Sequence, residues 1–341
     1  MSNLKKNVEE LSVEINAFIR NALINEHDLC ANLYTLKQYF LLAKGDFWSI
    51  FISMAGNLLE SCSLKKYELE AAMSSASLPT STELFERVQV RLLSGILGPS
   101  EQRLKGWDML SLGYIVDTPL SVIISPDHLK QYQSIFAFLL HAYQIDWKLS
   151  HSWQSQIRIE HLLHKLNLRD DNLRIISLVR QRMFHFMKNL QSFLQFEKLD
   201  AAWKQLSNEL STSLSLTEFV AAHDKYLSNL LPSNLEKLNT MFIIMSNFCD
   251  HSKTHLDRFM KNLLEIEAFR KSVQMRIDQG QWGVDFDDHE VPFVPMNTED
   301  IEIAASDFES HILNFLEQSS ELPQSLLFCL QFNGYYASRV Y

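Results

Sequence analysis

The sequence predicts an all-α protein, an elongated helical bundle with long antiparallel helices and a short extended segment near 110–124. Glycine and proline number only 9 and 8 in 341 residues, well below average usage, so tight turns are few. Apolar residues recur at spacings of three and four over long tracts, which is the pattern of an amphipathic helix face. Hydrophobic residues make up 46% of the chain, enough for one large core or two modest ones.

The first element is a predicted helix that starts at a Ser2 cap. Its apolar residues repeat at four and three, namely Leu4, Val8, Leu11, Ile15, Phe18, Ala22 and Leu23. A second helix is expected from an Asp28 cap to Lys44, because Gly45 can end a helix. Asp46 is then expected to cap a third helix that runs to about Leu59.

The next part of the chain mixes short helices, loops and an extended segment. Residues 64–96 predict two shorter helices, separated by a loop at 74–82 that is rich in Ser, Pro and Thr. Residues 95–106 form the following linker. From Trp107 to Ile124, β-branched and aromatic residues occur without helical spacing and Pro119 excludes a helix interior. This segment is therefore predicted to be extended.

Long helices dominate the rest of the sequence. Ser125-Pro126-Asp127 supplies an N-cap, a first-turn proline and a helix-start acid, and an apolar face follows it at Leu129, Tyr132, Ile135, Phe136, Leu139, Leu140 and Tyr143. A tract from Ile176 to Leu210 predicts about forty helical residues, about 60 Å long. A second tract spans 233–277 and should pack antiparallel to the first across a shorter helix at 216–230.

The C-terminal part begins with an acidic loop. Residues 280–302 contain seven acidic residues, two prolines and no Lys or Arg, so we expect a solvated, mobile loop. Helices are expected near 299–317 and 323–331. The resulting division has an N-terminal helical part (1–106), a central long-helix bundle (107–279), the acidic loop (280–302) and C-terminal helices (303–341).

Composition argues against several classes of function. The formal net charge of −10 does not favour a nucleic-acid surface, which needs clustered Lys and Arg. Four cysteines lie far apart and form no C-x-x-C pair, so neither a disulfide framework nor a zinc knuckle is indicated. The sequence shows no signal peptide and no apolar run of membrane-spanning length. We expect a soluble cytoplasmic protein with no nucleic-acid partner and no membrane span.

No catalytic or cofactor motif is found. Phosphate loops, dinucleotide-binding turns, nucleophile elbows and zinc-protease helices are all missing. His251 and His255 lie four apart beside Asp250, and His161 and His164 lie three apart, but neither pair has a third ligand nearby. Core or surface positions are the better interpretation for all the histidines. We therefore expect no enzyme activity, no cofactor and no metal.

Some polar residues suggest structural or interface roles. Asp46 and Asp117 sit beside turn residues, so a helix cap and a corner hydrogen bond are favoured over a chemical role. Asn189, Gln191 and Glu197 lie in an otherwise apolar helix, where they are either solvated or hydrogen-bonded across an interface. Most of the 22 phenylalanines should be core packing. Phe196 and Trp203 are expected to be core anchors.

Four stretches carry a family resemblance. Residues 107–120 fit W-D-x-L-S-L-x-Y-x-V-D-x-P-L, and a helix with Y-x-x-I-F-x-F-L-L follows them. Residues 36–47 fit L-K-x-Y-x-L-L-x-x-G-D-F. Residues 182–203 resemble R-M-x-x-F-x-x-N-L-Q-x-Y-x-x-F-E-V-L-E-x-x-W, and a histidine and a Tyr-Leu pair follow at His223 and 226–227. Together with residues 326–336, these stretches resemble the C-terminal Grip domain of the gamma-tubulin complex proteins.

The last of these stretches departs from the family pattern. Residues 326–336 are similar to L-x-x-R-L-D-F-N-x-Y-Y, but Cys329 and Gln331 stand where Arg and Asp are usual. Residues 279–284, QGQWGV, resemble a short element of the component-three branch. The four stretches occur in the family's order, so the resemblance covers nearly the whole chain.

The resemblance implies a subunit that binds gamma-tubulin and, with other complex components, positions it for microtubule nucleation. It implies a location in the cytoplasm and cytoskeleton at microtubule-organising centres, the centrosome or spindle pole body. Partner contacts are expected from polar and aromatic residues of the matching stretches, namely Asn189, Gln191, Glu197, His223, Asn333 and Tyr335. No counterpart of the family's N-terminal half is visible, so we expect the chain to hold gamma-tubulin without the lateral contacts that build a ring.

Two other classes fit the residues alone. A helical scaffold or vesicle-tethering subunit would share the length, acidity and lack of motifs. A helical enzyme of the isoprenoid-synthase type would need Asp pairs on facing helices, and Asp170-Asp171 is the one such pair outside the acidic loop.

Overall fold

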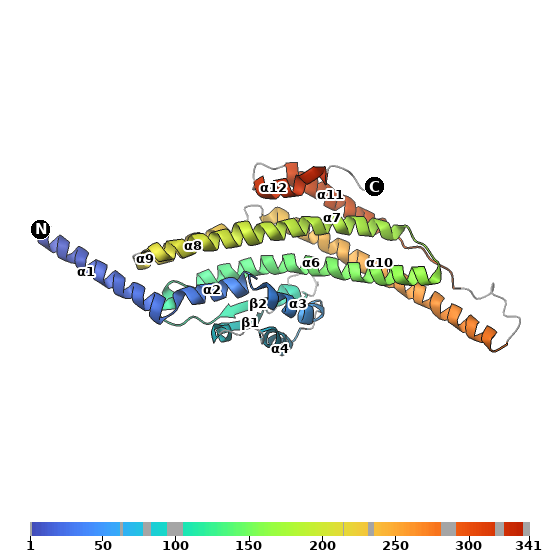
Figure 1. Cartoon of the computed structure of the whole chain (residues 1–341), viewed down its shortest axis with the longest axis horizontal. Helices are drawn as coiled ribbons and strands as arrows, with labels where there is room; N and C mark the ends of the chain where they lie inside the picture. The colour runs from blue at the N-terminus through green and yellow to red at the C-terminus, as the bar shows by residue number, and fades with distance from the viewer. Residues whose placement is uncertain are drawn as a thin grey trace, which may run out of the picture. The chain divides into compact units, whose positions relative to one another are not determined.

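The computed structural model describes residues 2–61, 64–77, 83–93, 105–213, 215–230, 235–280, 291–317 and 324–336. These residues are predominantly helical (Figure 1), which confirms the all-α prediction. The helices are α1 (Ser2–Asn21), α2 (Leu29–Phe40), α3 (Gly45–Leu59), α4 (Lys66–Ser77), α5 (Gly106–Met109), α6 (Pro126–Leu166), α7 (Asn172–Ser192), α8 (Ala201–Thr212), α9 (Leu216–Leu230), α10 (Leu235–Asp278), α11 (Glu299–Glu317) and α12 (Gln324–Gln331). Two π-helical segments, η1 (Ala22–Glu26) and η4 (Phe193–Asp200), two strands, β1 (Val88–Leu92) and β2 (Leu110–Tyr114), and three 3₁₀ turns, η2 (Glu83–Arg87), η3 (Leu120–Val122) and η6 (Phe332–Gly334), complete the described elements.

The chain forms two compact units. Unit 1 contains residues 1–144 and 191–233, and unit 2 contains residues 145–190 and 234–341. The boundary at 144/145 falls inside α6 and the boundary at 190/191 falls inside α7, so α6 begins in unit 1 and continues into unit 2. The four-part division made from the sequence stays a prediction.

Aromatic side chains form the core of unit 1. Phe40 packs against Tyr132 with ring centroids 6.0 Å apart, and Trp48 packs against Phe51 and Phe136 at 5.4 and 5.6 Å. These side chains are fully buried, and edge-to-face or tilted contacts of this kind add to the hydrophobic effect. The core thereby joins α2 and α3 to the first part of α6.

The turn between α2 and α3 differs from the sequence prediction. Helix α2 ends at Phe40 rather than Lys44, Leu42 takes a positive φ of 54°, and Gly45 is the first residue of α3 rather than a stop. Leu41 and Leu42 are buried, at 0% and 2% exposure, so burial of two leucines outweighs the usual preference for glycine in the left-handed region.

Neither predicted aspartate cap at these helices forms. Asp28 precedes α2 in the expected position, but it has a φ of 49° and its side chain does not cap the helix. Asp46 lies in the first turn of α3, where Lys44 is the N-cap. A carboxylate in the first turn still interacts favourably with the helix dipole.

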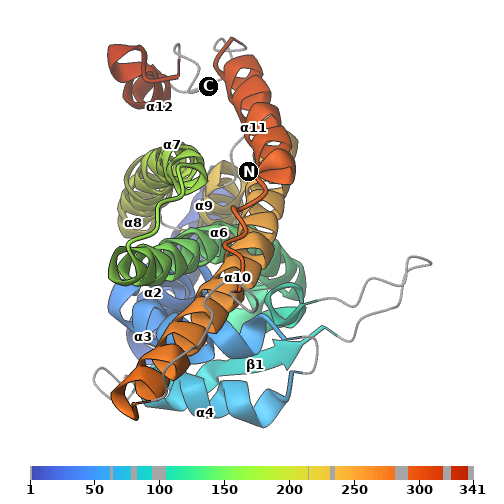
Figure 2. The ribbon, with the colours of Figure 1, turned by 90° about the vertical axis from the view of Figure 1, so that its right-hand side faces the viewer.

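A β-hairpin replaces the second short helix predicted within 64–96. After α4 and the turn η2, β1 pairs antiparallel with β2, with Val88 opposite Tyr114 and Leu92 opposite Leu110. Figure 2 shows β1 beside α4. Every residue of β2 is buried, so its backbone needs a partner strand, and the alternating Val-Gln-Val-Arg-Leu of β1 supplies one. The predicted extended segment is confirmed at β2, but its ends, α5 and η3, are single helical turns.

Gly106 is required by a close backbone approach. A Cβ atom at this position would lie 2.9 Å from the Cα and carbonyl oxygen of Leu59, too near for any other residue. The Gly106 N–H donates to the carbonyl of Ser61. The chain entering β2 is therefore fixed against the end of α3.

The long helices of unit 2 are held by ion pairs and polar contacts. Asp146 pairs with Lys188 at 3.0 Å and the Gln156 amide oxygen accepts from Arg180 at 2.6 Å, so α6 and α7 run antiparallel. Lys148 pairs with Asp250 at 3.0 Å and Lys165 with Glu267 at 2.7 Å, so α10 runs parallel to α6. It follows that α7 and α10 are antiparallel, as the sequence predicts.

Residues 291–298 form an irregular segment with half of its residues exposed, as their composition suggests, but the segment is fixed to unit 2 at Met296. Met296 is 5% exposed, its N–H donates to the Asp170 carboxylate at 2.9 Å, and its carbonyl accepts from Asn172 at 2.7 Å. Asp170 also accepts the Asn172 N–H. Asp170, the first residue of the Asp pair considered for an isoprenoid-type site, thus holds this segment, while residues 281–290 lie outside the described part.

The helical tract 172–212 is continuous, but η4 interrupts its α-helical period, which the apolar spacing did not reveal. Phe196 in η4 is 66% exposed, so its prediction as a core anchor is wrong. Trp203 is half-buried between Tyr34 and Tyr226, with ring centroids 5.7 and 6.2 Å away, and Lys37 Nζ lies 5.4 Å from its ring. A change of helical period turns the following side chains to other faces.

Two phenylalanines of this tract, one buried and one exposed, test which positions of the tract belong to the core. We predict that Phe186→Ala lowers the free energy of unfolding by about 3 to 5 kcal/mol, because Phe186 is fully buried. Phe196→Ala should change it by no more than about 0.5 kcal/mol. Urea unfolding of both variants beside the parent chain measures the difference, and equal losses would contradict the assignment.

Candidate functional site

The C-terminal segment is fastened to α7 by a cluster that we call the clasp: Arg182, His185 and Asn189 of α7 with Tyr335 and Tyr336. Three α7 residues spaced three and four apart share one face of the helix. Tyr336 is 3% exposed, and the two tyrosines follow η6 at the end of the described chain. The clasp lies wholly within unit 2.

A chain of hydrogen bonds runs through the clasp. The Tyr336 hydroxyl donates to the Arg182 carbonyl at 3.1 Å, so it accepts from His185 Nδ1 at 2.9 Å. His185 Nε2 is then the acceptor for the Asn189 amide at 3.1 Å, and the same amide donates to the His185 carbonyl at 2.8 Å. Burial lowers the pKa of His185, which favours the neutral ring that this arrangement needs.

Aromatic and ionic contacts complete the clasp. The His185 ring lies over Tyr335 with centroids 4.2 Å apart and planes 30° apart. The Arg182 guanidinium lies 5.3 Å from the Tyr336 ring and 5.9 Å from the Tyr335 ring, within the range of cation–π attraction. It also pairs with the buried Glu309 of α11 at 3.5 Å. Arg182 of α7 therefore contacts both α11 and the two tyrosines.

Next to the clasp, aromatic side chains face solvent. Phe328 and Phe332 are 68% and 58% exposed, and their ring centroids are 5.9 Å apart. Buried Leu326 and Leu330 hold α12 from its other side. The two departures from the family pattern, Cys329 and Gln331, are both exposed. Paired exposed aromatic side chains on a fixed helix are typical of protein-binding surfaces.

The structure brings only some of the predicted site residues together. Asn189 and Tyr335 both contact the His185 ring, Asn189 at Nε2 and Tyr335 at the ring face, and Asn333 lies in the neighbouring turn η6. Gln191 and Glu197 belong to unit 1, where Glu197 is exposed on η4. His223 also belongs to unit 1, but it is 0% exposed. Their roles in partner binding stay predictions.

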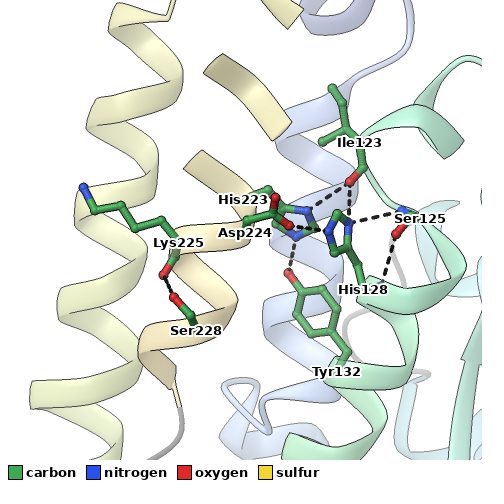
Figure 3. Close-up of polar contacts among 8 residues, drawn as sticks. All are labelled: Ile123, Ser125, His128, Tyr132, His223, Asp224, Lys225 and Ser228. Atoms are coloured by element: carbon green, nitrogen blue, oxygen red, sulfur yellow. Dashed lines mark hydrogen bonds and ion pairs between the residues drawn. The ribbon is translucent and has the colours of Figure 1, made fainter. Parts of the chain in front are cut away.

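His223 forms a buried joint between α6 and α9 (Figure 3). The carbonyl oxygen of Ile123 lies 2.7 Å from His128 Nδ1 and 3.1 Å from His223 Nδ1. His223 Nε2 lies 3.0 Å from the Tyr132 hydroxyl, and His128 Nε2 lies 2.6 Å from the Asp224 carboxylate. The start of α6 is capped as predicted, with the His128 N–H donating to Ser125 Oγ at 3.2 Å.

The electrostatics of this joint favour one protonation state for His223. Burial, and then the neighbouring His128, lower the pKa of His223 to about 4. The Nδ1–H of the neutral ring donates a hydrogen bond to the Ile123 carbonyl, and Nε2 accepts a hydrogen bond from the Tyr132 hydroxyl. Both nitrogens are thereby satisfied, as a buried polar group requires.

Sequence reasoning missed the residues that hold the predicted ones in place. His185 lies between two residues that were predicted, and its spacing from Asn189 was the available signal. His128 follows the Ser-Pro-Asp helix start directly, yet its contact with Asp224 joins residues 96 positions apart, which no local pattern reports.

Asp117 accepts the corner hydrogen bond from Ser121 through its carbonyl and also pairs with Arg87 at 2.8 Å.

The described residues offer no metal site and no membrane span. No group of three His, Cys, Asp or Glu side chains in this part of the chain is arranged to hold an ion. His251 is exposed, whereas His255 is buried and pairs with Asp300 at 3.4 Å. None of the helices described here combines the length and apolarity needed to cross a bilayer.

Comparison with known proteins defines the class. A family model described as the gamma tubulin complex component C-terminal domain matches residues 29–336. This match covers nearly all of the described chain, from the start of α2 through the clasp. The chain therefore belongs to the gamma-tubulin complex component family.

The relatives are named as spindle pole body components or gamma-tubulin complex components. The chain is 27% identical to spindle pole body component 98 of Dictyostelium discoideum over 98% of its own length and 42% of that protein. It is 22% identical to the gamma-tubulin complex component 3 homolog of Xenopus laevis and 23% identical to human component 3, in each case over 96% of the chain and 39% of the relative. The chain spans about two fifths of the length of these relatives, and the component-three resemblance is confirmed.

The buried His223 predicts a pH dependence of stability. Between about pH 6.5 and its folded pKa of about 4, the unfolded chain binds a proton that the folded chain does not, so stability falls as pH is lowered through this window. From about pH 7 to about pH 5 the loss from this residue should be about 2 kcal/mol. Unfolding free energies of the parent and His223→Gln, at both pH values, measure it.

The control is the exposed His161. His161→Gln should keep the acid-induced loss of the parent chain, whereas His223→Gln should lose less stability on acidification. An identical loss in all three proteins would contradict the assignment of a neutral, buried His223.

Proposed function

We propose that this chain is a gamma-tubulin-binding subunit of the gamma-tubulin complex, which positions gamma-tubulin for microtubule nucleation. The observation that carries the proposal is the family match over residues 29–336, because it includes both units and ends at the clasp. Gamma-tubulin and other complex components would be its partners. No chemistry is required of the chain, and its lack of enzyme activity stays a prediction.

The mechanism is geometric. Holding gamma-tubulin molecules at the spacing of protofilaments raises the effective concentration of each for its neighbours. The loss of translational and rotational freedom that the first ring requires then occurs before free tubulin binds. Long helices suit this role, since α6 and α10 have 41 and 44 residues and are fixed to one another by ion pairs in unit 2.

The surface that we favour for gamma-tubulin is formed by Phe328, Phe332 and Tyr335, while Asn189 of α7 and Asn333 of the turn η6 stay predicted contacts. Aromatic side chains dominate binding energy at protein interfaces when they are held in place before binding. The clasp supplies that rigidity, because Tyr335 is stacked on His185 and faces Arg182. Gln191 and Glu197 would contribute a second contact from unit 1, while the buried His223 would act by supporting α9.

The location follows from the proposed role. Relatives are named as spindle pole body components, and we propose the same kind of place for this chain, a microtubule-organising centre such as a centrosome or spindle pole body, reached through the cytoplasm. The chain spans only part of its relatives, so partners that those proteins contact elsewhere are outside this proposal.

Binding is tested with the purified chain and gamma-tubulin. We predict co-sedimentation as a one-to-one complex at micromolar concentration. Replacing Phe328 and Phe332 together by alanine should weaken binding at least about tenfold, which corresponds to about 1.4 kcal/mol. Tyr67→Ala is the matched control, because Tyr67 is an exposed aromatic residue of α4, 62% exposed, outside the proposed surface.

The outcomes separate two failures. If the parent chain does not co-sediment with gamma-tubulin, the proposed function is wrong. If the parent and the double variant bind equally well, the function stands and the surface lies elsewhere.

The isolated chain should nucleate microtubules poorly even while it binds gamma-tubulin. A single tethered gamma-tubulin presents no lateral array, so free tubulin must still form the first protofilament contacts. A light-scattering assay of tubulin polymerisation measures this, with gamma-tubulin alone as the control. Strong nucleation by the chain and gamma-tubulin would show that ring-forming contacts reside within these residues.

A further inference from the structure

Helix α1 carries an apolar stripe that unit 1 leaves uncovered. Leu11, Ile15 and Phe18 are 60%, 50% and 71% exposed. Helix α1 approaches the rest of unit 1 near its C-terminal end, where Arg20 donates to the Ser211 carbonyl at 2.8 Å. Figure 1 shows its N-terminal end reaching beyond the other helices of unit 1.

The stripe is as narrow as a coiled-coil seam. Its positions in the sequence alternate by four and three, at Leu4, Val8, Leu11, Ile15, Phe18 and Ala22. The stripe therefore occupies only two positions of each heptad, as in a coiled-coil seam, whereas a helix on a globular core shows a broader apolar face. The pattern therefore fits a single helix as its cover.

The residue types at these positions favour a second copy of the same helix. Val8 and Ile15 occupy the first apolar position of each heptad, and Leu4 and Leu11 occupy the second. β-Branched residues at the first position with leucine at the second favour parallel, two-stranded coiled coils. A symmetric pair of identical helices satisfies this preference at the layers of residues 4, 8, 11 and 15, and Phe18 and Ala22 follow them.

The flanking residues agree with a parallel arrangement. In a parallel pair, Asn7 would face Ser12 of the second copy and Glu14 would face Ile19, so no like charges meet. In an antiparallel pair aligned on the same apolar layers, Glu14 of one helix would face Glu14 of the other. Like charges in such positions are unfavourable.

We propose that α1 pairs with α1 of a second copy of this chain in a parallel, two-stranded coiled coil through Leu11, Ile15 and Phe18. The seam belongs to unit 1, whereas the clasp belongs to unit 2. Three heptads form a short coil, so the dissociation constant should be on the order of tens of micromolar. Dimerisation would bring together two copies that can each hold a partner.

The test is the oligomeric state of the whole chain, measured by sedimentation velocity from about 1 to about 100 µM. The parent chain should shift from monomer to dimer over this range. Ile15→Asp should raise the dissociation constant at least about tenfold. Val13→Asp is the matched control, because Val13 is 69% exposed, β-branched and two residues away on the opposite face, and it should dimerise like the parent.

Orientation is tested by oxidative cross-linking. With Cys30, Cys62 and Cys329 replaced by serine, Leu11→Cys should give a covalent dimer, because a parallel pair brings residue 11 of both copies together within disulfide reach. A monomeric parent chain at all concentrations, or equal dimerisation of the Ile15→Asp and Val13→Asp variants, would overturn the proposal. A dimer that does not cross-link would overturn the parallel register.

Discussion

Buried polar groups on α6 must find partners, and the pairs they make connect the helices of each unit. In unit 1, His128 reaches Asp224 at 2.6 Å, and the Ile123 carbonyl just before the helix joins His128 to His223. In unit 2, Lys148 is 6% exposed and pairs with Asp250, and Gln156 accepts from the buried Arg180. An unpaired charge at such depth costs several kcal/mol. Together, these contacts therefore fix how α7, α9 and α10 are aligned along α6.

The same reasoning explains how the C-terminal segment is held. A short helix such as α12, eight residues long, is not stable by itself. The clasp anchors the turn that follows it, since Tyr336 is bonded to both the backbone and the His185 ring of α7. What remains exposed is a small aromatic surface on a rigid support. That combination suits the binding role which we propose for a member of the gamma-tubulin complex component family.

Local periodicity was sufficient to predict α9, α10 and α11, because their apolar stripes are regular and their ends carry clear signals. It failed where long-range contacts decide the structure. Residues 88–92 form a strand because they pair with β2. Leu42 adopts a positive φ because the turn buries both Leu41 and Leu42. Residues 291–298 are held by the hydrogen bond from the Met296 N–H to Asp170. Asn189 and Tyr335 could be selected from the sequence, but His185, which joins them, required three-dimensional information. The π-helical period of η4 likewise has no signature in the apolar spacing, and Phe196 was misplaced for that reason.

The central claim is that the C-terminal aromatic surface next to the clasp is where this chain meets gamma-tubulin. Hydrogen–deuterium exchange of the whole chain, with and without saturating gamma-tubulin, tests it directly, because binding slows the exchange of covered amides. The account predicts slower exchange of residues 324–336 when gamma-tubulin is present. Unchanged exchange in these residues, with slowing confined to other parts of the chain, would contradict it.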